Sequence, residues 1–247
     1  MSYTINTTYK AKYYGSQRAV NKIKYIVIHY TANNGTTASA KSNANYFANI
    51  TTTKASAHYV VDESSIIYQC VPDNYIAWSV GDNQKYTNGG ATMKNIITNT
   101  NSMSIEMVSH SDLNGKYYIP DKTIQNTIEL IQDLQKKYNI SDSNLYRHYD
   151  VTGKLCPKPF VDDISLWDNF KKLISGLKNH SDNYYKVQSK YGFDDNTMSY
   201  LEAYQYADSL FMLMLQEDKN EQKYQLNTVL YILGYQYGKE VFEKLNK

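Results

Sequence analysis

Three residues that can bind a metal ion, His29, His148 and Cys156, are the first candidates for chemistry in this sequence. His29 lies near the end of the apolar run at residues 24–30, KYIVIHY, which we expect to be a buried strand. His148 and Cys156 are eight positions apart in a segment rich in turn-forming residues, so their side chains can converge on one point. Two imidazoles and a thiolate suit catalytic zinc, which takes three protein ligands and leaves a fourth position for water. From spacing alone, a structural role for the three residues is an equal alternative.

The elements that must position these residues are short strands alternating with helices. Helices are expected at 37–50, 121–138 and 164–177, and further strands at 57–62, 66–71 and 102–108. Helix 121–138 is amphipathic, with four aliphatic residues on one face: Ile124, Ile128, Ile131 and Leu134. Residues 146–159 are expected to form a loop, broken by Gly153, Pro157 and Pro159. This order predicts an α/β fold with a mixed central sheet flanked by helices.

The last quarter of the chain differs in composition and in hydrophobic pattern, which predicts a second domain. Residues 180–185 form a polar linker, and helical patterns fill 201–215 and 225–245. We therefore divide the chain into a catalytic domain at 1–178 and a small all-α domain at 179–247. Two such apolar helices cannot bury their surface alone, so they must pack with a third helix near 184–191, dock on the first domain, or pair with another copy of the chain. Cell-wall binding and homo-oligomerisation are both open.

Composition and charge exclude several classes of protein. A net charge of +2 argues against nucleic acid as a partner. No window approaches the roughly 18–20 apolar residues that span a bilayer, and the N-terminal residues lack the apolar core of a signal peptide. Two cysteines make no disulfide framework. We therefore expect synthesis in the cytoplasm and no membrane span; a substrate outside the membrane would require release of the protein by another factor.

Several segments together resemble a known enzyme family. IVIHYT, SAHYVVD, AWSVGD, NSMSIEM and RHYDVTGKLCP occur in one order and are similar to type-2 N-acetylmuramoyl-L-alanine amidases and peptidoglycan-recognition proteins, above all to phage and prophage endolysins of Gram-positive hosts. The resemblance covers about residues 20–175. It implies a site in a groove at one edge of a mixed sheet, with Zn²⁺ held by His29, His148 and Cys156. It also implies hydrolysis of the bond between N-acetylmuramic acid and L-alanine in peptidoglycan.

Hydrolysis of that bond needs a proton acceptor and a stabilised oxyanion. Glu106 is the best proton acceptor, because its apolar strand neighbours Ile105 and Met107 point to the opposite face. The resemblance gives its counterpart the same role; the alternative is a solvated glutamate at a strand edge. Lys154 matches a family lysine that supports the oxyanion, a contribution on the order of 3 kcal/mol by analogy. An ordinary surface lysine is the alternative there.

Other positions are assigned to the substrate or depart from the family pattern. Thr31, His58 and Trp78 are the expected substrate contacts, with Trp78 stacking on sugar or peptide or else closing the core. Ala57 stands where some members carry a catalytic tyrosine, and His58 either compensates or packs. Ser79 replaces a frequent histidine. Asp150 is expected to orient a ligand or pin its loop, and His110 and His180 to lie on the surface.

Three functions remain in competition. The leading one is a peptidoglycan amidase that acts on the cell wall as an endolysin, after holin-type release, or as an autolysin. A non-catalytic peptidoglycan-binding module is the first alternative, but such relatives lose the cysteine ligand, whereas Cys156 is present. A cytoplasmic amidase that recycles muropeptides is the second. The added helical region favours the lysin, because a recycling enzyme needs no module that targets the wall.

Overall fold

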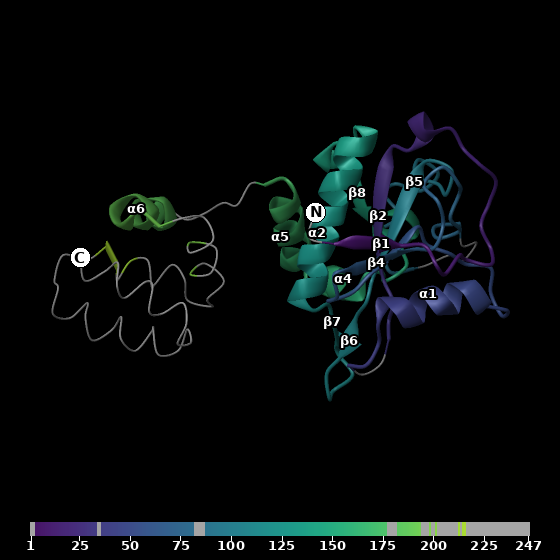
Figure 1. Cartoon of the computed structure of the whole chain (residues 1–247), viewed down its shortest axis with the longest axis horizontal. Helices are drawn as coiled ribbons and strands as arrows, with labels where there is room; N and C mark the ends of the chain where they lie inside the picture. The colour runs from purple at the N-terminus through teal and green to yellow at the C-terminus, as the bar shows by residue number, and fades with distance from the viewer. Residues whose placement is uncertain are drawn as a thin grey trace. The chain divides into compact units, whose positions relative to one another are not determined.

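The structure, a computed structural model, describes residues 3–33, 36–81, 87–176 and 182–193 and the single residues 198, 201, 212, 214 and 215. The chain divides into two compact units, Met1–Leu177 and Lys178–Lys247 (Figure 1). Within the described ranges, no helix is long and apolar enough to cross a membrane.

A six-stranded mixed sheet forms the centre of the first unit, as the sequence predicts. Its order is β1 (Thr4–Asn6), β4 (Ile66–Gln69), β3 (Tyr59–Val61), β5 (Ser102–Met107), β2 (Tyr25–Tyr30) and β8 (Leu145–Arg147). The β3–β4 pair is antiparallel and the other neighbours are parallel. The central strands β2 and β5 are buried along most of their length, which explains their continuous apolar runs.

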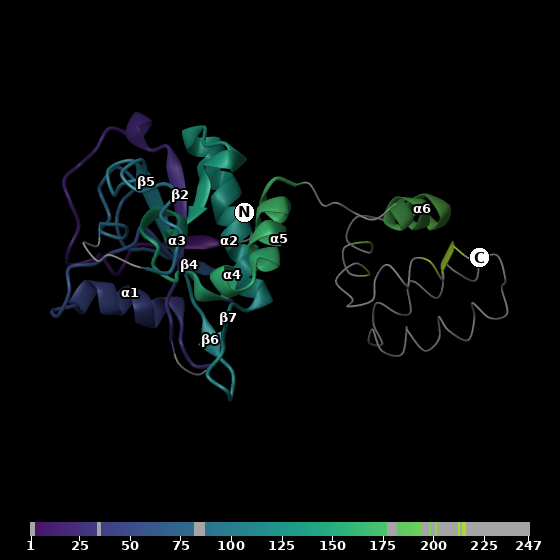
Figure 2. The same ribbon diagram turned by 180° about the vertical axis from the view of Figure 1, so that it is seen from behind.

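Helices cover both faces of the sheet (Figures 1 and 2). Buried apolar cores fill the space between the layers. The larger core joins Ile26, Ile28 and Ile105 to helices α2 (Asp121–Tyr138) and α5 (Ile164–Ile174). On the other face, α1 (Ala40–Asn49) packs through three residues, Ala40, Ala44 and Phe47. Because side chains alternate along a strand, His29 points to the face opposite Ile28, the face that α1 covers.

The expected helix 121–138 is confirmed at both ends. Leu134 and Ile131 are buried in the larger core, and Ile124 and Ile128 pack against it partly exposed. The C-cap Asn139 adopts the left-handed conformation that ends many helices. Near one end of the sheet, a hairpin of β6 (His110–Ser111) and β7 (Tyr117–Tyr118) is an element that the sequence pattern did not predict. Strands of two residues are too short to show alternation.

The prediction of a loop at 146–159 was wrong. The segment contains the end of β8, helix α3 (His148–Thr152) and the start of helix α4 (Lys158–Asp162). Gly153 ends α3 with a φ of 84°. Pro159 lies in the first turn of α4, where a backbone N–H has no acceptor within the helix, so its absence costs no helical hydrogen bond. The residues that indicated a loop are therefore the boundaries of two short helices. Single 3-10 turns at Val20–Lys22 and Asp142–Asn144 complete this unit.

In the second unit the structure describes helix α6 (Asp182–Tyr191), so the linker expected at 180–185 is partly helical. Lys190 Nζ and Tyr191 Oη donate hydrogen bonds to the carbonyl of Met214, at 3.2 and 2.6 Å. The helices expected at 201–215 and 225–245 lie almost entirely outside the described residues.

Candidate metal centre and catalytic cleft

The first part of the site is the end of two neighbouring strands. In the parallel register of β2 and β5, His29 is paired with Glu106. Residues paired in this way project to the same face of a sheet, so the imidazole and the carboxyl group lie side by side on the face that α1 covers. Carboxyl ends of parallel strands are the common place for a site in an α/β protein.

The second part comes from strand β8, on the other side of β2. Ile28 pairs with Arg147, so His148 follows directly after the strand, at the same edge as His29. After α3 the chain turns back at Gly153, and the Tyr149 N–H donates to the Cys156 carbonyl at 2.9 Å. This short return brings Cys156 beside His148 although eight residues separate them in sequence.

The structure brings His29, His148 and Cys156 together as a compact buried cluster. One ligand atom from each lies within 4.8 Å of the other two. Cys156 Sγ is 3.9 Å from His29 Nδ1, and the two imidazole centroids are 4.6 Å apart. The three residues are only 2–3% exposed. The sequence motif thus becomes a cluster of two imidazoles and one thiol whose atoms could hold a metal ion.

The residues fit a bound cation by their chemistry. His29 Nε2 is buried with no hydrogen-bond partner among the described residues, a costly arrangement that a metal ligand bond would relieve. Burial, and then the nearby His148, hold the pKa of His29 well below its usual value, so the imidazole is neutral as a metal ligand must be. A donor set of two imidazoles and a thiolate matches zinc. His29, His148 and Cys156 would hold the ion.

Glu106 has the properties of a proton acceptor. Its Oε2 atom is buried and has no hydrogen-bond partner within the described part of the chain. Removal from water raises the pKa of this carboxyl to about 8, and the nearby Lys154 opposes the rise. A carboxyl group with a pKa near neutrality can take up a proton and return it within one reaction cycle.

A cleft of about 300 Å³ lies over the cluster and exposes it to a substrate. Lys154 lines it and is exposed, and its positive charge lowers the pKa of both His29 and Glu106. Trp78 also lines it and stacks on Tyr13, with ring centroids 6.5 Å apart at 10°. Sequence reasoning missed several lining residues for which it offered no signal: Tyr30, Asn43, Tyr46, Phe47, Ala55, Ser56 and Leu155.

Thr31 and His58 differ in position although both were expected to contact substrate. Thr31 lines the cleft, and its hydroxyl accepts a hydrogen bond from the Ser109 N–H at 3.1 Å. His58 is not among the cleft-lining residues. It is 1% exposed, and its Nδ1 accepts from the Ser104 N–H at 3.0 Å. Its Nε2 lies 3.1 Å from the Tyr75 carbonyl and 3.0 Å from Arg18 Nη2, so both ring nitrogens have partners in the interior and the ring is a packed structural group.

Burial and the neighbouring Arg18 guanidinium, which lies 3.0 Å from His58 Nε2, lower the pKa of His58 to about 3.

His110 was expected on the surface but is only 4% exposed. It lies 3.2 Å from a Glu63 oxygen and against the Tyr118 ring. The unpredicted hairpin β6–β7 buries it. His180 lies outside the described residues.

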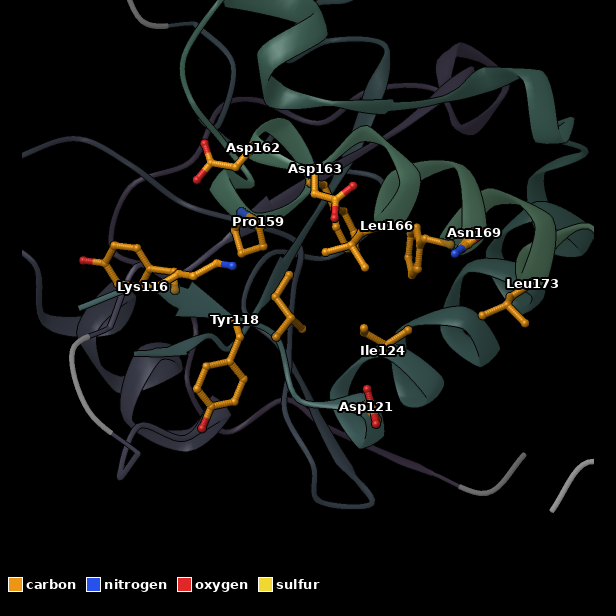
Figure 3. Close-up of a pocket in the computed structure, with 14 residues that line it drawn as sticks. Lys116, Tyr118, Asp121, Ile124, Pro159, Asp162, Asp163, Leu166, Asn169 and Leu173 are labelled. Atoms are coloured by element: carbon orange, nitrogen blue, oxygen red, sulfur yellow. The ribbon is translucent and has the colours of Figure 1, made fainter. Parts of the chain in front are cut away.

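A second and larger cavity, of about 480 Å³, lies between the β6–β7 hairpin and helices α2, α4 and α5 (Figure 3). Its lining is mostly aliphatic and aromatic, with carboxylates at Asp121, Asp162 and Asp163. Its lining, as far as the structure describes the chain, includes none of the residues that the sequence predicted for the site. The smaller cleft is therefore the candidate site, because it holds the clustered imidazoles, thiol and carboxyl group.

Fold and cleft together define an α/β protein with a candidate metal centre at the carboxyl ends of its central strands. The profile of the N-acetylmuramoyl-L-alanine amidase family matches residues 19–159, more than half of the chain. The chain belongs to this family.

Curated relatives and solved structures agree with this assignment. The chain is 38% identical over 160 residues to the N-acetylmuramoyl-L-alanine amidase CwlL of Bacillus licheniformis, covering 63% of this chain and 41% of that protein. It is 36% identical over 152 residues to XlyA of Bacillus subtilis (strain 168), covering 62% and 44%. The matches therefore span less than half of these two relatives.

Among solved structures, the catalytic domain of XlyA aligns with a TM-score of 0.53 at 30% identity, covering 70% of this chain and 99% of that domain. A mutant endolysin from Bacillus subtilis aligns with a TM-score of 0.51 at 31% identity, covering 71% and 99%. Both likenesses take in nearly all of the other chain.

Proposed function

We propose that this chain hydrolyses the amide bond between N-acetylmuramic acid and L-alanine in peptidoglycan, with Zn²⁺ as cofactor. The observation that carries the proposal is the cluster of His29, His148 and Cys156 with Glu106 beside it on the neighbouring strand. Family membership and relatives named as N-acetylmuramoyl-L-alanine amidases support the choice of bond.

Each part of the cleft has a role in such a reaction. His29, His148 and Cys156 would hold Zn²⁺, which in a site with three protein ligands would lower the pKa of a water molecule toward about 7 and polarise a carbonyl group. Glu106 accepts the proton of the attacking water and passes it to the leaving amine of L-alanine, a contribution of roughly 10²–10⁴ in rate. Lys154 places a positive charge where the tetrahedral oxyanion develops. Trp78 and Thr31 line the cleft and would orient the substrate.

The same residues give weaker support to two other functions. A module that only binds peptidoglycan has no use for a buried cysteine beside two histidines and a carboxyl group whose pKa is raised, and both are present here. A muropeptide-recycling amidase shares the chemistry and differs in where it acts. We place the activity on the cell wall, as an endolysin or autolysin, because a solved neighbour is an endolysin. We also propose that residues 179–247 bind the wall or join copies of the chain.

Digestion of purified peptidoglycan, with mass analysis of the new ends, tests the bond that is cleaved. We expect new N-terminal L-alanine amino groups and no new reducing sugars. New reducing ends would instead indicate a glycosidase, and no new ends at all would favour the binding module. Comparison of intact wall with soluble muropeptides as substrate separates a lysin from a recycling enzyme, since the latter would leave intact wall uncut.

A further inference from the structure

The two arginines of this chain occupy unusual positions for basic residues. The sequence contains 24 lysines but only Arg18 and Arg147 as arginines. Both arginines are buried, each 8% exposed. A guanidinium has five donors in a planar fork, whereas a lysine ammonium is a compact point charge. In a chain that otherwise uses lysine, a buried arginine indicates a position where the fork itself is needed.

Arg147 directly precedes His148 and contacts three helices, α3, α4 and α5. Its Nη2 and Nε atoms donate to the two carboxylate oxygens of Asp150, at 2.7 and 3.1 Å. The third arm, Nη1, donates to the Phe160 carbonyl at 2.8 Å. The guanidinium also lies over the rings of Tyr149 and Trp167, with its central carbon 5.2 and 5.5 Å from their centroids. Arg147 is therefore fixed on every side.

These contacts connect the carriers of two metal ligands. Asp150 belongs to α3, which His148 begins, and its Oδ2 also accepts the backbone N–H of Arg147 at 2.8 Å. Phe160 belongs to α4, four residues after Cys156. One arm of the guanidinium thus holds α4 while the other two hold α3, and Cys156 lies in the chain between them. A lysine could satisfy one of these partners but not all three oxygens in one plane.

We propose that Arg147 is a positioning residue for the metal centre: with Asp150, it sets the separation of His148 and Cys156 by joining α3 to α4. This inference rests on the proposed zinc site. Mutation of residues that hold the metal ligands in place commonly changes metal affinity about 10–100-fold, because these residues orient the groups that bind the ion. Arg147 acts here through His148 and Cys156 and is not expected to touch the substrate.

The test compares Arg147→Lys with Arg18→Lys in the full chain. Arg18 is a matched control, because it is equally buried and donates to backbone carbonyls, including Ser102 at 2.7 Å. Among the residues that the structure describes, none of its hydrogen bonds joins the segments that carry His148 and Cys156. Zinc affinity is measured by competition with a chromophoric chelator. The absorption spectrum of the Co²⁺-loaded protein reports ligand geometry independently of activity.

We expect Arg147→Lys to weaken zinc binding roughly 10–100-fold and to shift the cobalt bands. Arg18→Lys should lower the melting temperature while zinc affinity and the cobalt spectrum stay unchanged. Wild-type affinity and spectrum in Arg147→Lys would overturn the inference, and so would an equal loss in both variants, which would indicate general destabilisation.

If Arg147→Lys does not fold, Asp150→Asn decides the question. The amide has the size of the carboxylate but accepts at one oxygen only, so zinc binding should again weaken, and unchanged affinity would overturn the inference. A wild-type chain that bound neither Zn²⁺ nor Co²⁺ would overturn the proposed function and this inference with it. Tight wild-type binding that persisted in Arg147→Lys and Asp150→Asn would overturn this inference alone.

Discussion

Glu106 and His29 are register partners on adjacent parallel strands, so a carboxyl group and an imidazole share one end and one face of the sheet. The two side chains have different environments. Burial raises the pKa of Glu106 to about 8, whereas it holds the pKa of His29 well below its usual value. The lowered pKa keeps the imidazole of His29 neutral, as metal binding requires, and the raised pKa gives the Glu106 carboxylate a higher affinity for a proton than a solvated glutamate has. This division of roles underlies the first two predictions.

The first prediction concerns the metal. Cys156→Ser or His29→Ala should remove nearly all amidase activity and most zinc binding, because a site with three ligands holds a catalytic ion poorly once one is lost. We expect one zinc per wild-type chain, measured by elemental analysis. Cys70→Ser is the control, since Cys70 is buried in the core under α1 and lies outside the cluster. Full activity after exhaustive chelation would contradict the zinc mechanism.

The second prediction separates proton transfer from metal binding. Glu106→Gln should keep the fold and the zinc but lower kcat by roughly 10²-fold or more, because an amide cannot accept a proton. Lys154→Ala should cost less, since it removes only one charge near the oxyanion. Steady-state kinetics on a soluble muropeptide, with zinc content measured in parallel, checks both. Normal turnover in Glu106→Gln would show that the proton leaves by another route.

The third prediction distinguishes a substrate contact from a packed residue. Trp78→Ala should raise KM for muropeptides, because it removes an aromatic surface from the cleft wall. His58→Ala should leave KM unchanged and lower the free energy of unfolding by about 1–3 kcal/mol, because the Ser104 N–H loses its acceptor. Kinetics and denaturant unfolding of both variants decide the matter. A raised KM in His58→Ala with unchanged stability would show that His58 contacts the substrate.

The fourth prediction concerns residues 179–247. A shortened chain ending at Gly176 should fold, keep zinc and cleave soluble muropeptides, because the large cores that form around the sheet lie between Tyr3 and Ile174. It should bind and lyse intact walls more weakly than the full chain. Pelleting with purified walls and loss of turbidity measure this. Equal binding by both chains would exclude wall targeting, and an insoluble short chain would indicate that the second unit stabilises the first.

Much of the site follows from the sequence because its signals are local. The β-branched run that ends near His29 predicts a buried strand by composition alone, and the spacing in RHYDVTGKLCP places His148 and Cys156 near each other. Helix Asp121–Tyr138 follows from the period of its aliphatic residues. In each case the forces that decide the structure act between residues that are near in sequence.

The tertiary structure alone decides which polar residues face the cleft. His58 looks like a site residue in sequence, but its partners are Arg18, 40 positions away, and Ser104, 46 positions away, and they bury it. The burial of His110 likewise depends on a hairpin that has no periodic signal. Arg147 shows its role only when Phe160 and Asp150 are placed around it. Burial and hydrogen bonding depend on the whole packed environment of a side chain, whereas the periodicity of a sequence indicates only which face of a single helix or strand is apolar.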